Sequence, residues 1–245
     1  MRGLGGKRVV VTGGTSGIGE AASRRFLAEG AQVTALAVGE DEVATAAERI
    51  AGIEAMRCDV ADRGAVEAAF AAIGDVDVLV ANAGISIRKP FLEIDPDDWQ
   101  RVLDVNLTGV FHCAQVAARG MSERGGVILM TASTNGLTGH ENYADYNASK
   151  AGVILLARTM ARELAPAVRV NAVCPGYVLT PMQEAEYTPE MLAAVDGKIP
   201  LGRHARPEEL AGLFAFLASD AGAYVTGAVI PMDGGETAGG IASRG

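Results

Sequence analysis

The sequence predicts an α/β protein in which helices cover both faces of one parallel, doubly wound sheet. Three observations predict this fold. Short β-branched runs alternate with amphipathic helical patterns along nearly the whole chain, the first run leads directly into a glycine-rich turn, and no long Pro- or Ser-rich stretch divides the sequence. We therefore expect residues 1–245 to form a single domain.

The first strand and the turn after it have the pattern of a phosphate-binding site. Lys7 to Thr12 (KRVVVT) is a β-branched run, residues 13–19 read GGTSGIG, and a helical pattern extends from Glu20 to Glu29. Glycines let such a turn approach a pyrophosphate, whose charge meets the free N–H groups and the dipole at the helix start. Alone, the glycines also fit an ordinary tight turn, but strand, turn and helix in this order predict a dinucleotide site.

The same alternation continues along the chain. Asp95, with Pro96 next to it, marks the start of the helix that carries Asn106, and Pro166 ends the longest helix. Ligands bind at the carboxyl ends of the strands in such sheets. We expect further strands at 32–38, 53–58, 76–81, 126–132, 168–174 and 227–232, and further helices at 40–50, 63–73, 143–164 and 207–217.

Residues 177–200 are expected to form a long functional loop. They contain no strand pattern, and only one short helix is predicted there, beginning at Thr188-Pro189-Glu190. A loop of that length within a compact domain usually serves a function. Residues 236–245 are expected to form a C-terminal tail, of which 239–245 would be mobile.

The composition excludes several classes of protein. With a net charge of −9, the 245-residue chain is a poor partner for nucleic acid or an anionic membrane. No apolar run has the length of a membrane span or the form of a secretion signal. The three cysteines are far apart among apolar residues, which predicts reduced core thiols in a cytoplasmic protein. No metal-ligand spacing joins them to the histidines, so we expect no bound metal.

Tyr146 and Lys150 are the most informative pair in the chain. Residues four apart share one face of a helix, so the Lys150 ammonium would lie near the Tyr146 phenol and favour its ionisation. Bringing a tyrosine pKa from about 10 to near 7 requires about 4 kcal/mol. One screened lysine cannot supply this, and an oxidised nicotinamide ring would provide the second positive charge. The pair therefore also predicts a dinucleotide site.

Tyr143 is the alternative to Tyr146 as an acid/base. The residue four positions after it is Asn147, which carries no charge that would lower a phenol pKa. Tyr146 is therefore the stronger candidate.

Several segments, in this order and spacing, resemble the short-chain dehydrogenase/reductase family. The resemblance covers nearly the whole chain and implies a Rossmann-like fold. It is carried by residues 12–19 (TGGTSGIG), 82–84 (NAG), Asn106, Ser133, 146–150 (YNASK) and 175–176 (PG).

The resemblance implies a role for each of four residues. Tyr146 would be the general acid/base, and Lys150 would lower its pKa and bind the nicotinamide ribose. Ser133 would hydrogen-bond the substrate oxygen, and Asn106 would hold a water that links Lys150 to solvent. Taken singly, Ser133 and Asn106 also fit ordinary structural roles.

The resemblance also implies a set of cofactor-binding residues. Asp59 would contact the adenine ring, although it could equally cap the following segment; Pro175 and Gly176 would shape the loop beneath the nicotinamide, and Thr180 would bond its carboxamide. The full set is Gly13, Thr15, Ser16, Gly17, Ile18, Gly19, Val38, Asp59, Val60, Asn82, Ala83, Gly84, Tyr146, Lys150, Pro175, Gly176, Val178 and Thr180.

The sequence favours NAD over NADP without excluding NADP. Val38 at the end of the second strand is neither acidic nor basic, but Glu40 and Asp41 follow and would repel a 2′-phosphate. Ser16 stands where many NADP-using relatives have Arg or Lys.

Three functions stay open on the sequence. The first is an NAD(P)-dependent oxidoreductase of a secondary alcohol or ketone, such as a small alcohol, sugar or polyol. The second is a 3-oxoacyl-(acyl-carrier-protein) reductase, which the acidic net charge disfavours. The third is a non-catalytic dinucleotide-binding sensor or scaffold. Whichever function applies, the family resemblance implies a homotetramer. Substrate contacts are expected in the loop 177–200 and at Thr134, Asn135, His140, Tyr143 and Gln183, with Met182, Tyr187 and Met191 lining an apolar part.

Overall fold

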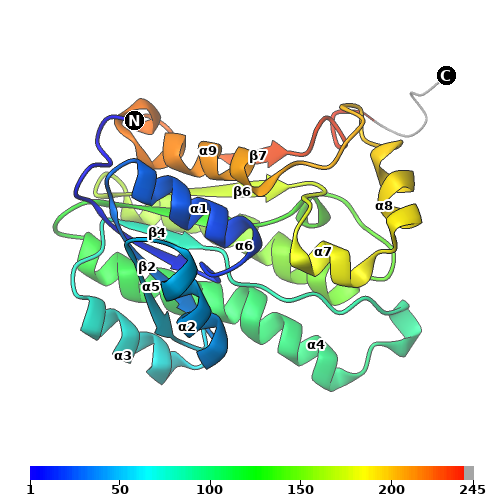
Figure 1. Cartoon of the computed structure of the whole chain (residues 1–245), viewed down its shortest axis with the longest axis horizontal. Helices are drawn as coiled ribbons and strands as arrows, with labels where there is room; N and C mark the ends of the chain where they lie inside the picture. Colours follow the sequence, from blue (N-terminus) through cyan, green and yellow to red (C-terminus); the bar gives the residue numbers. More distant parts are fainter. Residues whose placement is uncertain (240–245) are drawn as a thin grey trace.

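The computed structural model describes residues 1–239 and contains a seven-stranded, wholly parallel sheet. The strand order is β3-β2-β1-β4-β5-β6-β7 (Figure 1). The order reverses direction between β1 and β4, which is where such sheets bind their ligands. The predicted fold class is confirmed. The strands are β1 (Arg8–Thr12), β2 (Gln32–Ala37), β3 (Ile53–Arg57), β4 (Val78–Ala81), β5 (Gly126–Thr131), β6 (Val168–Pro175) and β7 (Val229–Met232).

Helices cover both faces of the sheet. Because side chains alternate along a strand, Val9 and Val11 pack toward α1 (Gly17–Ala28) and α9 (Pro207–Ala218), whereas Val10 packs toward the opposite layer. That layer contains α3 (Arg63–Ile73), α5 (Gly109–Met121) and α6 (Ala144–Leu164), while α2 (Glu40–Arg49) packs beside β3 (Figure 1). The continuous apolar runs read from the sequence are thus strands buried on two sides.

The predicted helix that carries Asn106 is interrupted. It begins as α4 (Pro96–Leu103), where the Asp95 carboxylate accepts a hydrogen bond from the Asp98 N–H at 2.8 Å, as the capping pattern predicts. A π-helical turn, η2 (Asp104–Thr108), then joins α4 to α5, with the Gly109 N–H bonded to the Asp104 carbonyl. Asn106 lies within this turn.

The long loop contains two short helices where one is predicted. These are α7 (Pro181–Glu186) and α8 (Pro189–Asp196). Both begin with Thr-Pro, and the Thr180 and Thr188 hydroxyls each accept a backbone N–H three residues later at 3.3 Å. The expectation of a single helix is wrong because the first Thr-Pro pair has the same capping geometry as the second.

The remaining described parts of the chain are four short helical turns and the C-terminal segment. Glu236 and Thr237 belong to a turn held by Asp233, whose carboxylate accepts bonds from Gly235 and from both the N–H and the hydroxyl of Thr237. Most of the predicted tail 236–245, namely residues 240–245, lies outside the described residues. No helix between residues 1 and 239 is both long and apolar enough to cross a bilayer. The turns are η1 (Phe91–Glu93), η2, η3 (Thr134–Gly136) and η4 (Asp220–Gly222).

Candidate active site

The glycine-rich turn leads from β1 into α1 and is too tight for side chains. Gly13 and Gly17 have φ of +62° and +51°, a conformation that favours glycine. A methyl group on Gly19 would lie 2.0 Å from the carbonyl oxygen of Gly13. At these glycines no side chain stands between the backbone and a ligand, so a pyrophosphate can approach the N–H groups at the start of α1.

The carboxyl ends of β1, β4 and β5 are tied together by side chains. The Thr12 hydroxyl accepts hydrogen bonds from the N–H groups of Asn82 and Ala83, both at 2.9 Å. The Asn82 amide donates to the Thr12 carbonyl at 3.2 Å and accepts from the Thr131 hydroxyl at 3.1 Å. The glycine-rich turn and the segment 82–84 are thus held in one fixed arrangement.

Ser133, Tyr146 and Lys150 converge on this same edge. Ser133 follows β5, and its hydroxyl accepts from the Asn135 N–H at 3.1 Å. Tyr146 and Lys150 lie on α6, and the Lys150 ammonium donates to the Thr131 carbonyl at 2.9 Å while lying 5.5 Å from the centroid of the Tyr146 ring. The predicted helix pair is therefore brought together in the structure.

Burial opposes charge on both members of the pair. It raises the pKa of Tyr146 to about 12, even though a hydrogen bond with Ser133 lowers it. Burial also lowers the pKa of Lys150 to about 8. Lys150 alone does not lower the phenol pKa below its ordinary value, in line with the expectation that a second positive charge is needed.

Asn106 is fully buried and binds the backbone beside Lys150. Its carbonyl oxygen accepts from the Ile85 N–H at 2.8 Å, and its amide donates to the Ile85 carbonyl at 2.9 Å. A methyl group on Gly84 would lie 3.3 Å from the Asn106 oxygen and 3.5 Å from the Lys150 nitrogen. Asn106 therefore fixes the chain next to Lys150, and the water-holding role stays a prediction.

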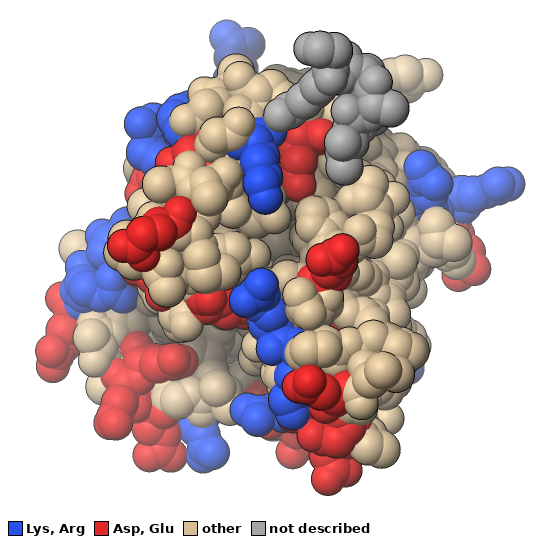
Figure 2. All heavy atoms as spheres, turned by 90° about the vertical axis from the view of Figure 1, so that its right-hand side faces the viewer, with Lys and Arg blue, Asp and Glu red and all other residues tan. Residues whose placement is uncertain are grey.

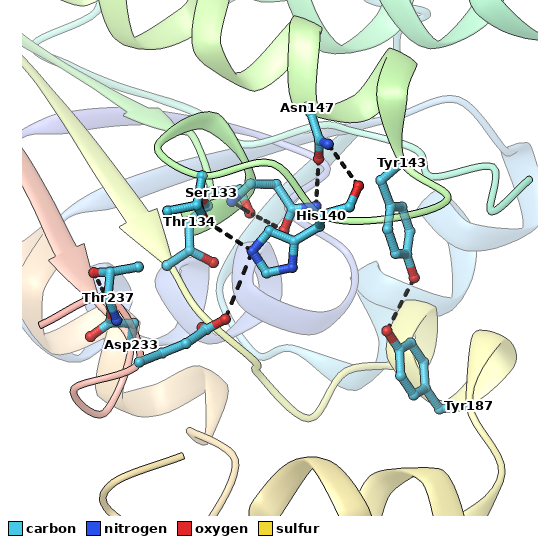
Figure 3. A network of polar contacts seen from close by, with 11 residues as sticks. Ser133, Thr134, His140, Tyr143, Asn147, Tyr187, Asp233 and Thr237 are labelled. Atoms are coloured by element: carbon cyan, nitrogen blue, oxygen red, sulfur yellow. Dashed lines mark hydrogen bonds and ion pairs between the residues drawn. The ribbon is translucent and has the colours of Figure 1, made fainter. Parts of the chain in front are cut away.

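Tyr143, the alternative acid/base, has a different environment. Its hydroxyl donates to the Glu186 carboxylate at 2.8 Å and lies 3.2 Å from the Tyr187 hydroxyl (Figure 3). Burial and these two partners raise the Tyr143 pKa above its ordinary range. The phenol of Tyr143 thus joins α6 to the end of α7.

Two connected cavities follow the carboxyl ends of the strands. The long cavity has a volume of about 590 Å³, and the inner cavity next to it about 160 Å³. Predicted cofactor residues of the long cavity are Gly13, Thr15, Ser16, Val38, Asp59, Val60, Ala83 and Gly84. Those of the inner cavity are Gly13, Ser16, Gly17, Ile18, Asn82, Ala83, Gly84, Tyr146, Lys150 and Thr180.

A small pocket of about 90 Å³ adjoins the inner cavity and opens toward an outer cleft of about 740 Å³. Ser133 and Tyr146 line the small pocket, and so do all five predicted substrate residues: Thr134, Asn135, His140, Tyr143 and Gln183. Met182 and Tyr187 line it as well, and Met191 lines the outer cleft. The loop 177–200 therefore lines both spaces, with α7 at the small pocket and α8 at the outer cleft.

Some predicted cofactor residues lie away from the cavities. Val178 is 4% exposed, forms a bridge with Ala205 and packs into the core. Pro175 ends β6 and is buried. Gly176 lines the small pocket, and Gly19 closes the glycine-rich turn.

Several acids that line the cavities are not among the predicted site residues, and two of them, Glu42 and Glu236, bear on the function. Glu42 lines the long cavity, and Glu236 lines the outer cleft. Glu42 follows directly on the predicted acids of α2, which is a local signal. Glu236 is 96 residues from His140 in the chain, so only the pairing of β6 with β7 brings it to this site.

Comparison with known proteins agrees with this geometry. A family model described as enoyl-(acyl carrier protein) reductase matches residues 13–237. The chain is 46% identical over 240 residues to cis-4-hydroxycyclohexanecarboxylate dehydrogenase of Sinomonas cyclohexanicum, covering 94% of this chain and 96% of that protein. The solved structure of a short-chain type dehydrogenase/reductase from Mycobacterium marinum superimposes with a TM-score of 0.89 at 40% identity, covering 96% of this chain and 97% of that one. The chain belongs to the short-chain dehydrogenase/reductase family.

A second relative of this dehydrogenase/reductase is named for a different activity. The 3-oxoacyl-(acyl-carrier-protein) reductase of Thermotoga maritima is 41% identical over 242 residues, covering 95% of this chain and 98% of that protein. The family is one of oxidoreductases that bind a nicotinamide cofactor, and the long and inner cavities fit such a dinucleotide because their glycine-lined floor leaves backbone open to phosphates. Within residues 1–239, no three His, Cys, Asp or Glu side chains gather to hold a metal ion.

Proposed function

We propose that this dehydrogenase/reductase is an NAD-dependent enzyme that interconverts a secondary alcohol and its ketone, with Tyr146 as general acid/base. One observation carries the proposal: Tyr146 lines both the small pocket, together with Ser133, and the inner cavity, together with Lys150 and the glycine-rich turn. Its phenol therefore borders the space for a substrate and the space for a nicotinamide at once.

The residues of the chain divide the chemistry between them. Tyr146 would give its phenolic proton to the carbonyl oxygen during reduction and take the hydroxyl proton during oxidation. Ser133 would hold the same oxygen by a hydrogen bond and polarise it. Lys150, anchored on the Thr131 carbonyl, would bind the nicotinamide ribose and place its charge beneath the Tyr146 ring. A bound nicotinamide would accept or return the hydride.

The preference for NAD is supported by Glu42. Glu40, which the sequence favours for this role together with Asp41, forms an exposed ion pair with the Arg57 guanidinium at 3.2 Å. The carboxylate of Glu42 instead approaches the Gly39 backbone and lines the long cavity beside Val38. An acid there can accept a hydrogen bond from a ribose 2′-hydroxyl and repel a 2′-phosphate.

A 3-oxoacyl-(acyl-carrier-protein) reductase is the second candidate, supported by the Thermotoga maritima relative. An acidic carrier protein would need a basic docking surface around the site. Figure 2 shows basic side chains interspersed with acidic ones on the face it presents, and the whole chain has a net charge of −9. A small-molecule substrate fits this charge distribution better. A non-catalytic sensor is disfavoured, because Ser133, Tyr146 and Lys150 line two adjoining spaces in a member of an enzyme family. Asn106 binds Ile85 next to Lys150.

Assembly and compartment complete the proposal. The family resemblance implies tetramer contacts through the helices that follow Asn106 and carry Tyr146, and through the last helix and strand. Apolar side chains on the outer surfaces of two of these helices support a homotetramer: Phe111 on α5 is 39% exposed and Leu155 on α6 is 59% exposed. Most of the apolar residues of α9 are buried within the subunit, so α9 supports it less. The three free cysteines are buried, which favours a reducing, cytoplasmic compartment. Sedimentation tests the assembly, and a monomer would contradict it.

A panel of secondary alcohols and ketones, followed by nicotinamide absorbance with NAD and with NADP, tests the function. We expect turnover with at least one alcohol–ketone pair, and its loss in Tyr146→Phe. Absence of turnover across the panel, in protein that binds the cofactor, would contradict the proposed function.

A further inference from the structure

His140 and Glu236 form a polar pair where the small pocket meets the outer cleft. His140 lines both spaces, and Glu236 lines the outer cleft. The His140 Nε2 and a Glu236 carboxylate oxygen are 3.8 Å apart (Figure 3). His140 shares the small pocket with Tyr146 and Ser133 and does not line the inner cavity, whereas Glu236 lies beyond it on the outer cleft.

The hydrogen bonds around His140 define its tautomer. The Thr138 hydroxyl donates to the Thr134 carbonyl at 3.2 Å, so its oxygen is left to accept from His140 Nε2 at 3.1 Å. The proton of the neutral ring is therefore on Nε2, and Nδ1 carries a lone pair. In Figure 3 both dashed lines to the ring meet on one nitrogen, and the other nitrogen has none. Burial lowers the pKa of His140, which keeps the ring neutral.

Glu236 offers a second acceptor. Its Oε2 is buried and makes no hydrogen bond with any described residue. Burial, and then the neighbouring charge of Asp233, raises the pKa of Glu236, although a hydrogen bond of the carboxyl group with Thr134 lowers it. The same oxygen lies 2.9 Å from the point where a side chain on Gly176 would begin, so it faces the loop that lines the small pocket. An unpaired buried acceptor costs free energy that a bound donor recovers.

We propose that His140 and Glu236 bind a second hydroxyl group of the substrate, so that the enzyme prefers diols, polyols or hydroxyketones to simple secondary alcohols. The inference rests on the proposed function, because it places the reacting oxygen between Ser133 and Tyr146. The second hydroxyl would then lie toward the outer cleft. There it donates its proton to Glu236 or to His140 Nδ1.

The chemistry of the pair selects a hydroxyl among polar groups. Two acceptors require a donor, and a carboxylate, ketone or ether oxygen has none to give. An ammonium group could also donate. The outer cleft carries the basic residues Arg88 and Lys198 as well as the acids Glu141 and Glu236, so its charges are of both signs and do not select a cation. We therefore assign a neutral donor, and the comparison with an amino alcohol tests this choice.

Matched substrates test the inference. We would compare kcat/KM for isopropanol with propylene glycol, and for cyclohexanol with the cyclohexanediols. The diol should exceed its parent alcohol by about tenfold or more in at least one set, the value of one hydrogen bond to a charged group. The ratio of diol to parent alcohol should fall at least about fivefold in Glu236→Gln and in His140→Phe. Using the ratio within each variant cancels general effects on folding or cofactor binding.

Glu141→Gln is the matched control. Glu141 is an exposed acid that lines the outer cleft outside the pair, so this variant removes the same charge and should keep the wild-type ratio. Equal kcat/KM for parent alcohols and diols, an equal fall of the ratio in Glu141→Gln, or a preference for an amino alcohol over the diol would overturn the inference and leave the proposed function standing. No turnover of any alcohol or ketone would overturn the proposed function instead.

Discussion

The ammonium of Lys150 lies 5.5 Å from the ring centroid of Tyr146 and is anchored by a hydrogen bond to the Thr131 carbonyl. Burial nevertheless raises the phenol pKa to about 12, against the lowering effect of its hydrogen bond with Ser133. For Tyr146 to act as a general base near neutral pH, further positive charge would be needed in the inner cavity. We therefore expect cofactor binding and activation of Tyr146 to be coupled.

Replacing Tyr146 by Phe should lower kcat by about two to four orders of magnitude, because the proton donor and acceptor is removed. Cofactor affinity, measured by fluorescence titration, should be nearly unchanged. Tyr143→Phe removes a matched hydroxyl that bonds Glu186, and it should keep the chemical step. Full activity of Tyr146→Phe would show that another group is the acid/base.

Stability of the cofactor-free enzyme should depend on pH through Lys150. Below its folded pKa of about 8, the lysine is charged in both states and the cost of burying that charge opposes folding in full. Between this value and the ordinary pKa of 10.5, the unfolded chain binds more protons, so the free energy of unfolding rises with pH.

As the pH rises across this window, the unfolding free energy of the wild type should increase by about 3 kcal/mol relative to that of Lys150→Met. Urea unfolding in a pH series, kept below the titration of Tyr146, measures it. Parallel pH profiles of the two proteins would mean that Lys150 is not desolvated in the free enzyme.

Glu42→Gln should shift cofactor preference toward NADP by about tenfold, measured as the ratio of kcat/KM for NAD and NADP. The reason is that Glu42 lines the long cavity and would face the ribose. Asp41→Asn makes the same change of charge one residue away and should move the ratio little. An NADP preference in the wild-type enzyme would contradict the role of Glu42.

Two glycine-to-alanine variants should change stability in opposite directions. In Gly19→Ala the new methyl group meets the Gly13 carbonyl at 2.0 Å, so we expect a fall in Tm of about 5 °C or more and loss of cofactor binding. In Gly212→Ala, inside α9, it meets only the end of the Arg25 side chain at 3.6 Å. That variant should gain about 0.5 to 1 kcal/mol from lower backbone entropy of the unfolded chain. Calorimetry of both proteins compares them directly.

The strand and helix order could be predicted because its signals are local. β-branched runs, the cap at Asp95 and the proline at 166 all act within a few residues. The helix α7 has the same Thr-Pro start as α8, but its six residues are too few to show a periodic pattern. The π-helical turn at 104–108 has no such local signature, so a continuous helix is expected there instead.

The site residues likewise fall into those that local sequence patterns predict and those that only the fold brings together. Tyr146 and Lys150 are four residues apart, and the glycine-rich turn is a local motif, so each of these two features could be recognised from a few neighbouring residues. Whether Glu40, Asp41 or Glu42 lines the long cavity depends on which face of the first turn of α2 points to it. The sequence does not contain this orientation, so it could not single out Glu42. Glu236 depends on the pairing of β6 with β7, which no local pattern contains. Contacts between distant segments decide the substrate side of the pocket.

The π-helical turn between α4 and α5 makes the length of this segment as important as its composition. It holds one residue more than an α-helical turn would, and this extra residue allows Asn106 to reach Ile85 while α5 still packs into the core. Deleting one residue from 104–108 would convert the π-helical turn into an α-helical one, so that α4 and α5 would keep the faces with which they pack. The side chains of the turn itself would be re-aimed, and we expect the Asn106 amide to lose its two bonds to Ile85. The extra residue therefore serves the site more than it serves the core.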